Sequence, residues 1–181
     1  MTTARTLVLV THPNIDTSVV NKRWLTELQA NPDIVTLNEL YARYPDQHID
    51  VRAEQDLLLA HDNIILQFPL YWFSTPPLLK KWMDEVLLQG FAYGSRHSER
   101  KLAGKRIGLA ISAGIKEIDF RATGRYAHTL EEFLMPLRST IDYISAESLP
   151  TFAFYGVEEG RASDELELSA AQYIQYIKNL Q

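Results

Sequence analysis

The sequence contains no cysteine, so disulfide bonds, thiolate catalysis and cysteine-ligated metals are excluded. It also lacks two glycine-rich phosphate loops: no G-x-G-x-x-G follows the first apolar run, and no G-x-x-x-x-G-K-[ST] occurs anywhere. Dinucleotide-binding Rossmann domains and P-loop NTPases are therefore disfavoured. A response regulator is disfavoured too, because no acidic cluster stands where its phosphorylation site would lie. We expect no metal centre.

Long hydrophobic runs and a surplus of basic residues are missing as well. The amino terminus offers only the apolar run 7–10, far short of the roughly 20 residues that span a bilayer. The net charge is -5 and no basic stripe is visible, which argues against a nucleic-acid partner. With 181 residues, 46% of them hydrophobic, the chain fits one domain over residues 1–181 in the cytoplasm.

Residues 62–94 organise the rest of the chain. A nearly continuous apolar run over 64–68 is typical of a strand covered on both faces of a parallel sheet. Two interleaved apolar rows then predict a helix that starts at Pro76 or Pro77, is capped by Ser74 or Thr75, and ends at Gly90. The loop between them follows a strand's carboxyl end, where open α/β sheets bind ligands. It contains Pro69, Leu70, Tyr71, Trp72 and Phe73.

Strand and helix patterns alternate along the whole sequence. We expect strands over 6–10, 33–37, 64–68, 107–112 and 149–155, and helices over 17–30, 51–61, 76–90, 127–144 and 164–180. Pro136 should kink or split the fourth helix. This alternation predicts an α/β fold, a three-layer sandwich with a five-stranded parallel sheet.

Two further strand ends should meet the aromatic loop at one edge of the sheet. After the first strand, a polar turn with His12 leads into a helix capped by Thr17 or Ser18, whose free N–H groups favour an anion. Many helices start this way and bind nothing, and a lone histidine there is more often structural. After the fourth strand, Gly114 would let the backbone approach a ring closely.

The segment QFPLYWFSTPPLLKKWMDEVLLQGFAYG resembles the flavin-binding segment of the NAD(P)H:quinone oxidoreductases of flavodoxin-like fold. Their bacterial branch includes the ancillary proteins of glutathione-gated potassium efflux systems, which residues 40–55 also resemble. The resemblance implies FMN, with FAD as an alternative, NAD(P)H as co-substrate, and two-electron transfer to a quinone by a ping-pong mechanism. It also implies a homodimer, with the helix around Trp82 and the loop 91–94 at the interface.

The resemblance also assigns candidate cofactor-binding residues by position. The flavin phosphate would lie at His12, Ser18, Val19, Val20 and Asn21. The ring would lie against the loop 69–73, with backbone N–H groups from Leu70 to Phe73 on its polar edge. It would also contact Ser112, Ala113, Gly114 and Ile115. The family pattern at this last place is usually Thr-Thr-Gly-Gly, from which three of the four positions depart, and Ala113 removes one hydroxyl.

In the better-known members, a tyrosine and a histidine beside the flavin assist hydride transfer. Phe120 stands where the tyrosine would be, so a hydroxyl is lost. Tyr126 and His128 lie near the place of the histidine and are the candidate catalytic residues, although surface positions for both are at least as compatible with the sequence.

Two other classes of function stay open. The chain could be a regulatory subunit that docks on a membrane potassium efflux transporter, at the inner face of the membrane. It could also be a one-electron carrier of flavodoxin type, which a net charge of only -5 and an aromatic-walled site make the weaker choice.

Overall fold

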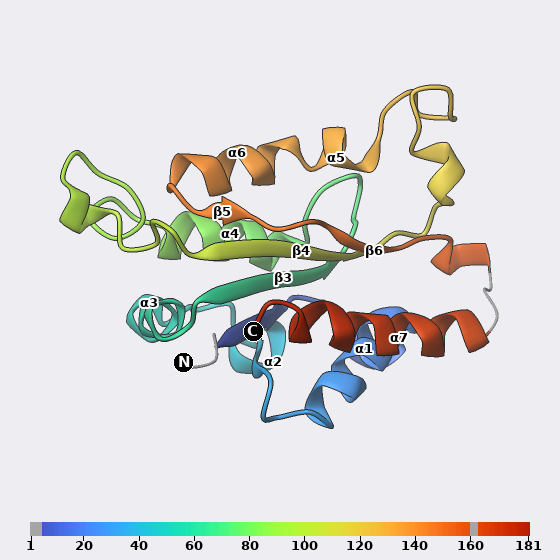
Figure 1. Cartoon of the computed structure of the whole chain (residues 1–181), viewed down its shortest axis with the longest axis horizontal. Coiled ribbons are helices and arrows are strands. Elements are labelled where there is room, and N and C mark those ends of the chain that lie inside the picture. The colour runs from blue at the N-terminus through green and yellow to red at the C-terminus, as the bar shows by residue number, and fades with distance from the viewer. Residues whose placement is uncertain (1–4, 160–162) are drawn as a thin grey trace.

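The computed structural model describes residues 5–159 and 163–181 as one layered α/β assembly (Figure 1). Its parallel sheet has the order β2-β1-β3-β4-β5, and β6 also pairs with β4. The strands are β1 (Thr6–Val10), β2 (Thr36–Glu39), β3 (Asn63–Pro69), β4 (Arg106–Ser112), β5 (Glu147–Ser148) and β6 (Phe152–Phe154). The helices are α1 (Val20–Gln29), α2 (Leu40–Arg43), α3 (Val51–Ala60), α4 (Pro77–Val86), α5 (Leu130–Phe133), α6 (Met135–Tyr143) and α7 (Ser163–Lys178).

The sheet divides the core into two hydrophobic clusters. Side chains alternate between the faces of a strand, and in β1 Leu7 and Leu9 pack into one cluster while Val8 and Val10 pack into the other. Helices α4 and α6 cover the first face, and α1 and α7 cover the second. All five residues of β1 and all seven of β3 are buried, as a strand covered on both sides should be. The predicted three-layer sandwich is confirmed.

Several predicted boundaries are wrong, each for a local reason. Helix α1 begins at Val20, because residues 15–17 form a 3₁₀ turn. Strand β2 begins at Thr36, since the Ile34 N–H bonds back to Asn31 in a turn. Helix α4 ends at Val86, and Gly90, with φ of 82°, belongs to a later turn.

Proline explains the two interruptions late in the chain. Pro136 splits the run 127–144 into α5 and α6, as expected, and Thr129 caps α5. The last strand is broken into β5 and β6 around Pro150, which has no N–H to offer a neighbouring strand.

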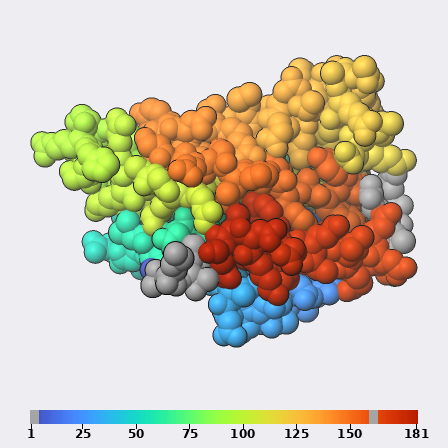
Figure 2. Space-filling view, in the orientation of Figure 1, coloured from blue at the N-terminus to red at the C-terminus, as the bar shows by residue number. Residues whose placement is uncertain are grey.

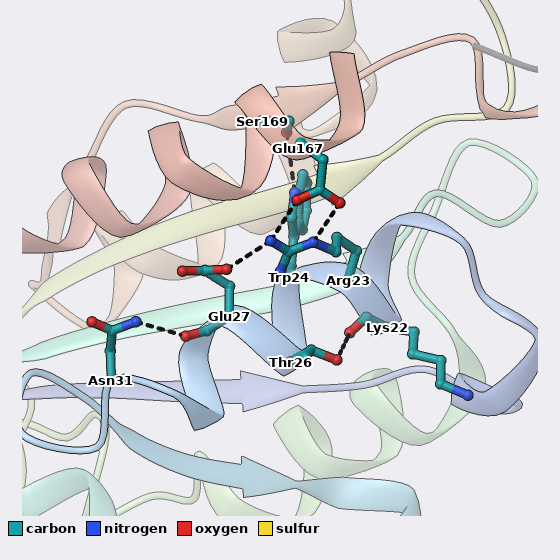
Figure 3. Close-up of polar contacts among 8 residues, drawn as sticks. All are labelled: Lys22, Arg23, Trp24, Thr26, Glu27, Asn31, Glu167 and Ser169. Carbon is teal, nitrogen blue, oxygen red and sulfur yellow. Dashed lines mark hydrogen bonds and ion pairs between the residues drawn. The ribbon is translucent and has the colours of Figure 1, made fainter. Parts of the chain in front are cut away.

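A polar seam fixes α1 against α7 (Figure 3). The Arg23 guanidinium lies between two carboxylates, donating to both oxygens of Glu167 at 2.8 and 2.7 Å and to Glu27 at 2.7 Å. These hydrogen bonds raise the pKa of Arg23 and lower that of Glu167. Beneath them, the buried indole of Trp24 donates to Ser169 Oγ at 3.1 Å. The helix whose first turn faces the candidate anion site is therefore held along its length.

A second polar cluster, Glu54 with its partners, lies between α2, α3, α4 and β2. The Glu54 carboxylate is fully buried and accepts hydrogen bonds from Asn38 Nδ2, Tyr44 Oη and Trp82 Nε1 at 2.7, 2.7 and 2.8 Å. Arg43 Nε lies 3.5 Å from it. This cluster buries the Trp82 side chain inside the subunit, so an interface on α4 would use other residues of that helix. The predicted interface stays a prediction.

The segment between α4 and β4 projects from one end of the body, and α7 lies along the face seen in Figure 2. Among the residues that the structure describes, no helix is long and apolar enough to cross a membrane.

Candidate functional site

The carboxyl ends of four strands are joined by backbone hydrogen bonds of 2.8 Å. Thr11 N donates to Gln67 O, Leu70 N to Ser112 O, and Ala113 N to Phe154 O. Above this edge lies a pocket of about 670 Å³, a size typical of small-molecule sites. Its walls are Leu70–Phe73, Ala113–Ile115, Arg125, Tyr126 and Glu158.

The aromatic loop makes a tight turn in an unfavourable backbone conformation. Tyr71 and Ser74 exchange backbone hydrogen bonds of 2.9 Å, and the two residues between them, Trp72 and Phe73, have φ of 50° and 60°. Left-handed φ values in bulky residues cost about 1–3 kcal/mol each and gather at functional sites. The expectation that four N–H groups of this loop face a ligand is wrong for Leu70 and Tyr71, which use theirs internally. Within the described chain, those of Trp72 and Phe73 find no acceptor.

The structure separates the two aromatic residues at the tip of this loop. The Phe73 ring packs on Phe133 at 4.7 Å and edge-on against Tyr126 at 5.0 Å. Trp72, in contrast, is 95% exposed. Packing of the Phe73 ring therefore offsets the strain of its backbone. The exposed Trp72 side chain has no comparable packing to offset its own strain.

The turn before α1 offers a cluster of free backbone donors. Ser18 Oγ accepts from Asn21 N at 3.1 Å. The N–H groups of Val19, Val20 and Lys22 have no acceptor among residues 5–159 and 163–181. Free N–H groups at a helix start, with the positive end of its dipole, favour an anion. The turn at Ser18, Val19 and Val20 is therefore suited to an anion, mainly through its backbone groups, and the phosphate site there stays a prediction.

His12 connects this turn to the aromatic loop. Its Nδ1 accepts from Asn14 N at 3.1 Å, and its ring lies edge-on to Tyr71 at 6.2 Å. Burial lowers the pKa of His12, because it disfavours the charged imidazolium. The neutral ring with an accepting Nδ1 carries its proton on Nε2.

Asn21 has an internal role. Its side chain is fully buried, donates to Ser112 Oγ at 2.7 Å, and receives Gln67 Nε2 at 3.4 Å on its own Oδ1. The side chains of Asn21 and Ser112 are therefore engaged beneath the site, linking α1, β3 and β4. Thr11 Oγ1, also buried, has no partner among the described residues.

The loop after β4 is covered by a carboxylate that sequence reasoning missed. A Cβ on Gly114 would lie 2.6 Å from Glu158 Oε1, so the carboxylate lies close over this glycine. Glu158 N donates to Gly114 O at 3.3 Å. In the described part of the chain, the N–H groups of Gly114 and Ile115 make no hydrogen bond. Ala113 N and O are both used, by Phe154 and Val157.

The two candidate catalytic residues differ in position. Tyr126 lines the pocket and touches Phe73 and Phe120, whose ring is buried. His128 does not line it: the His128 ring is exposed, packs on Phe133, and has Nδ1 3.8 Å from Glu132. Arg125, next to Tyr126, lines the pocket with its guanidinium 5.5 Å from the Tyr126 ring centre. No sequence signal pointed to Arg125 or Glu158.

Comparison with known proteins agrees with this architecture. A Bacillus subtilis protein named as an uncharacterized NAD(P)H oxidoreductase, YrkL, is 45% identical over 96% of this chain and 98% of its own. The glutathione-regulated potassium-efflux system ancillary protein KefG of Serratia proteamaculans is 35% identical over 97% of this chain and 93% of its own.

Two solved structures are close matches. General stress protein 14 of Treponema denticola, in complex with FMN, has a TM-score of 0.92 and 44% identity, covering 98% of this chain and 99% of that one. An NADPH-quinone reductase of P. pentosaceus has a TM-score of 0.85 and 32% identity, covering 96% and 97%. The model of a family described as having a flavodoxin-like fold matches residues 4–177. The chain therefore belongs to this family of flavodoxin-like fold.

Proposed function

We propose that the protein is an FMN-dependent NAD(P)H:quinone oxidoreductase with a ping-pong mechanism. The observation that carries the proposal is that two features of the structure lie side by side at one edge of the sheet. Free N–H groups at the start of α1 lie on one side, and an aromatic-walled pocket of about 670 Å³ lies on the other, with His12 against Tyr71 between them. An anionic tail attached to a flat ring fits that pair of features.

The residues present fit FMN on structural grounds. The N–H groups of Val19 and Val20 would hold its phosphate, with Ser18 adding a hydroxyl. Trp72, Phe73, Gly114 and Ile115 would hold the ring, because their N–H groups have no other acceptor in the described chain. The relative from Treponema denticola, 44% identical, was solved with FMN and supports this choice.

When bound, FMN supplies the redox chemistry, accepting a hydride from a reduced nicotinamide and passing two electrons to a quinone. The protein positions the two substrates in turn and supplies electrostatics. The unpaired N–H groups of Trp72, Phe73 and Gly114 would stabilise negative charge at the polar edge of the ring. They are held in place before any substrate arrives, since the strained turn and the Leu70–Ser112 hydrogen bond fix the loop.

Tyr126 is the better placed of the two candidate catalytic side chains. Its ring borders the pocket and is held by Phe73 and Phe120. We propose that Tyr126 orients the substrate ring. His128 would at most contact a substrate outside the pocket. Tyr126→Phe should lower kcat if the hydroxyl takes part, whereas an unchanged kcat would limit its role to packing.

We also propose a homodimer, formed through exposed side chains close to α4 and the loop 91–94. Phe91 and Ala92 are buried within the subunit, as Trp82 is. Exposed apolar side chains nearby are Leu88 and Tyr143, and the Tyr143 ring packs on Tyr93 at 5.4 Å. Light scattering should give twice the mass of the 181-residue chain, and a monomer would remove this part.

The first experiment is a visible spectrum of the purified protein with FMN, followed by NADPH under nitrogen and then a simple quinone. Loss of the flavin band on adding NADPH, and its recovery on adding quinone, would support the proposal. A protein that never retains FMN would contradict it. If NADPH removes the band but no quinone restores it, the reduction of FMN by NADPH would be supported and the electron acceptor would belong to another class.

A regulatory role on a potassium efflux transporter is the second candidate, supported by the similarity to KefG. The segment 40–55 that motivated it is explained by the fold. Tyr44 and Glu54 belong to the buried cluster, and the Tyr41 hydroxyl accepts from Leu78 N at 3.4 Å, replacing the caps expected from Ser74 or Thr75. Co-purification with a transporter would support docking through some other surface.

A further inference from the structure

Arg125 and Glu158 are exposed charged residues that line the pocket. Elsewhere in the same loop, Arg121 has a carboxylate partner in Glu117, 3.9 Å away. Within the described residues, Arg125 makes no ion pair and the Glu158 carboxylate accepts no hydrogen bond. Charged groups beside a ligand pocket that are not neutralised by the protein are available to whatever enters it.

Arg125 is placed to meet an anion on an incoming molecule. Its guanidinium lies over the face of Tyr126, and Tyr126 packs against Phe73 of the aromatic loop. Contact with the ring face uses none of the guanidinium N–H donors of Arg125. Two of these donors can bind two oxygens of one phosphate at the same time. The Tyr126 ring therefore orients the Arg125 guanidinium, while its N–H groups stay accessible from the opening of the pocket.

Glu158 carries the opposite charge and, like Arg125, is exposed at the pocket. Its carboxylate lies directly over Gly114, whose N–H we assign to the ring of the cofactor. A negative charge there disfavours any anionic group that approaches the reacting end of the pocket.

The two substrates of the proposed reaction differ in this respect, because NAD(P)H carries phosphates far from its reacting ring and a simple quinone is uncharged. We propose that Arg125 binds the phosphates of the nicotinamide dinucleotide and that Glu158 excludes anionic electron acceptors. Together they set the charge specificity of the pocket. This inference rests on the proposed function.

The test of Arg125 compares three electron donors: NADPH, NADH, and the phosphate-free N-benzyl-1,4-dihydronicotinamide. Arg125→Ala should raise KM for both dinucleotides about 10-fold, the loss expected for one charge-assisted hydrogen bond. It should leave kcat/KM for the phosphate-free donor unchanged. Arg125→Lys, which keeps the charge, should recover part of the loss. Arg121→Ala is the matched control, since Arg121 lies in the same loop but does not line this pocket.

A binding measurement separates recognition from turnover. ADP-ribose has the phosphates and no nicotinamide, and calorimetry on the FMN-loaded protein should show its affinity fall about 10-fold in Arg125→Ala. Equal losses with all three donors would overturn the inference, because Arg125 would then act through Tyr126 or the fold. No change with any donor would overturn it as well. A wild-type protein that oxidises none of the three donors would instead overturn the proposed function, and the inference with it.

Glu158 is tested with a matched pair of acceptors, a neutral naphthoquinone and its sulfonated derivative. Glu158→Gln should lower KM for the sulfonated acceptor about 3-fold or more by removing like-charge repulsion. KM for the neutral one should not change. Glu117→Gln removes a carboxylate that does not line this pocket and serves as the control. The same KM ratio between acceptors in Glu158→Gln and wild type would overturn this half of the inference.

Discussion

The Glu54 cluster and the ligand pocket are both polar regions beside the carboxyl ends of strands, and they treat polar groups in opposite ways. In the cluster, both oxygens of a fully buried carboxylate are matched by donors at 2.7–2.8 Å. In the pocket, four backbone N–H groups, one guanidinium and one carboxylate have no hydrogen-bond or ion-pair partner in the described chain. Buried polar groups are normally satisfied. The matched Glu54 carboxylate is therefore a structural feature, whereas Arg125, Glu158 and Trp72 are exposed at the pocket, where a ligand can reach them.

The most damaging change should be Glu54→Ala. It leaves Asn38, Tyr44 and Trp82 with buried donors that have lost their acceptor, and disrupting a buried charged network costs about 3–5 kcal/mol. We expect the free energy of unfolding in urea to fall by that amount. FMN affinity, measured on the fraction that remains folded, should change little.

The control for Glu54 is Glu85→Ala. Glu85 has a single partner, Lys81, on an exposed face of α4, and exposed ion pairs contribute about 0–1 kcal/mol. If the two variants lost equal stability, the cluster would not be the structural element that its hydrogen bonds indicate.

Trp72→Gly should separate stability from binding at the pocket. Glycine adopts φ of 50° without strain, and the 95% exposed indole contributes little packing, so unfolding should cost about 1 kcal/mol more than in wild type. FMN should be retained less well, because a wall of the pocket is lost. Urea denaturation without FMN and a fluorescence titration with FMN measure the two effects.

Phe73→Gly is the informative companion. It removes the same kind of strain but also the contacts with Phe133 and Tyr126, so it should destabilise the protein. If Trp72→Gly and Phe73→Gly both stabilised the protein, or both destabilised it, the conclusion that only Phe73 packs in the fold would be contradicted.

The sequence predicted the architecture, and pointed to one sheet edge for the candidate site, for one physical reason: buried parallel strands are apolar runs, and their carboxyl ends meet. It could not predict which way side chains turn at that edge. Asn21 points inward to Ser112, although its neighbours present N–H groups outward. Arg125 and Glu158 reach the pocket from loops whose course depends on tertiary contacts such as those of Phe120. The predicted end of α4 at Gly90 was wrong because Leu87 and Leu88, which follow the observed end at Val86, are good helix formers.

Arg23→Ala tests the polar seam between α1 and α7 and should have a smaller effect. Arg23 is held by two carboxylates, but Glu167 is 58% exposed, so about 0.2–1 kcal/mol should be lost, and less in high salt. Arg52→Ala, whose pair with Asp56 is more exposed, should lose less still. Urea denaturation at two salt concentrations checks both values. A loss independent of salt would assign the effect to packing of the arginine stem.

The least of these effects should appear as a pH dependence of stability centred on His12. Its pKa in the folded protein is lowered by burial, so the unfolded chain binds a proton more readily. The stabilising contribution is therefore complete above the ordinary value of 6.5 and is lost as the pH falls below it. Protonation would also end the hydrogen bond that Nδ1 accepts from Asn14 N, loosening the turn before α1. Urea midpoints between about pH 7.5 and 5.5 should fall more steeply in wild type than in His12→Gln. Parallel slopes would show that His12 keeps its ordinary pKa and that the turn is fixed by its backbone alone.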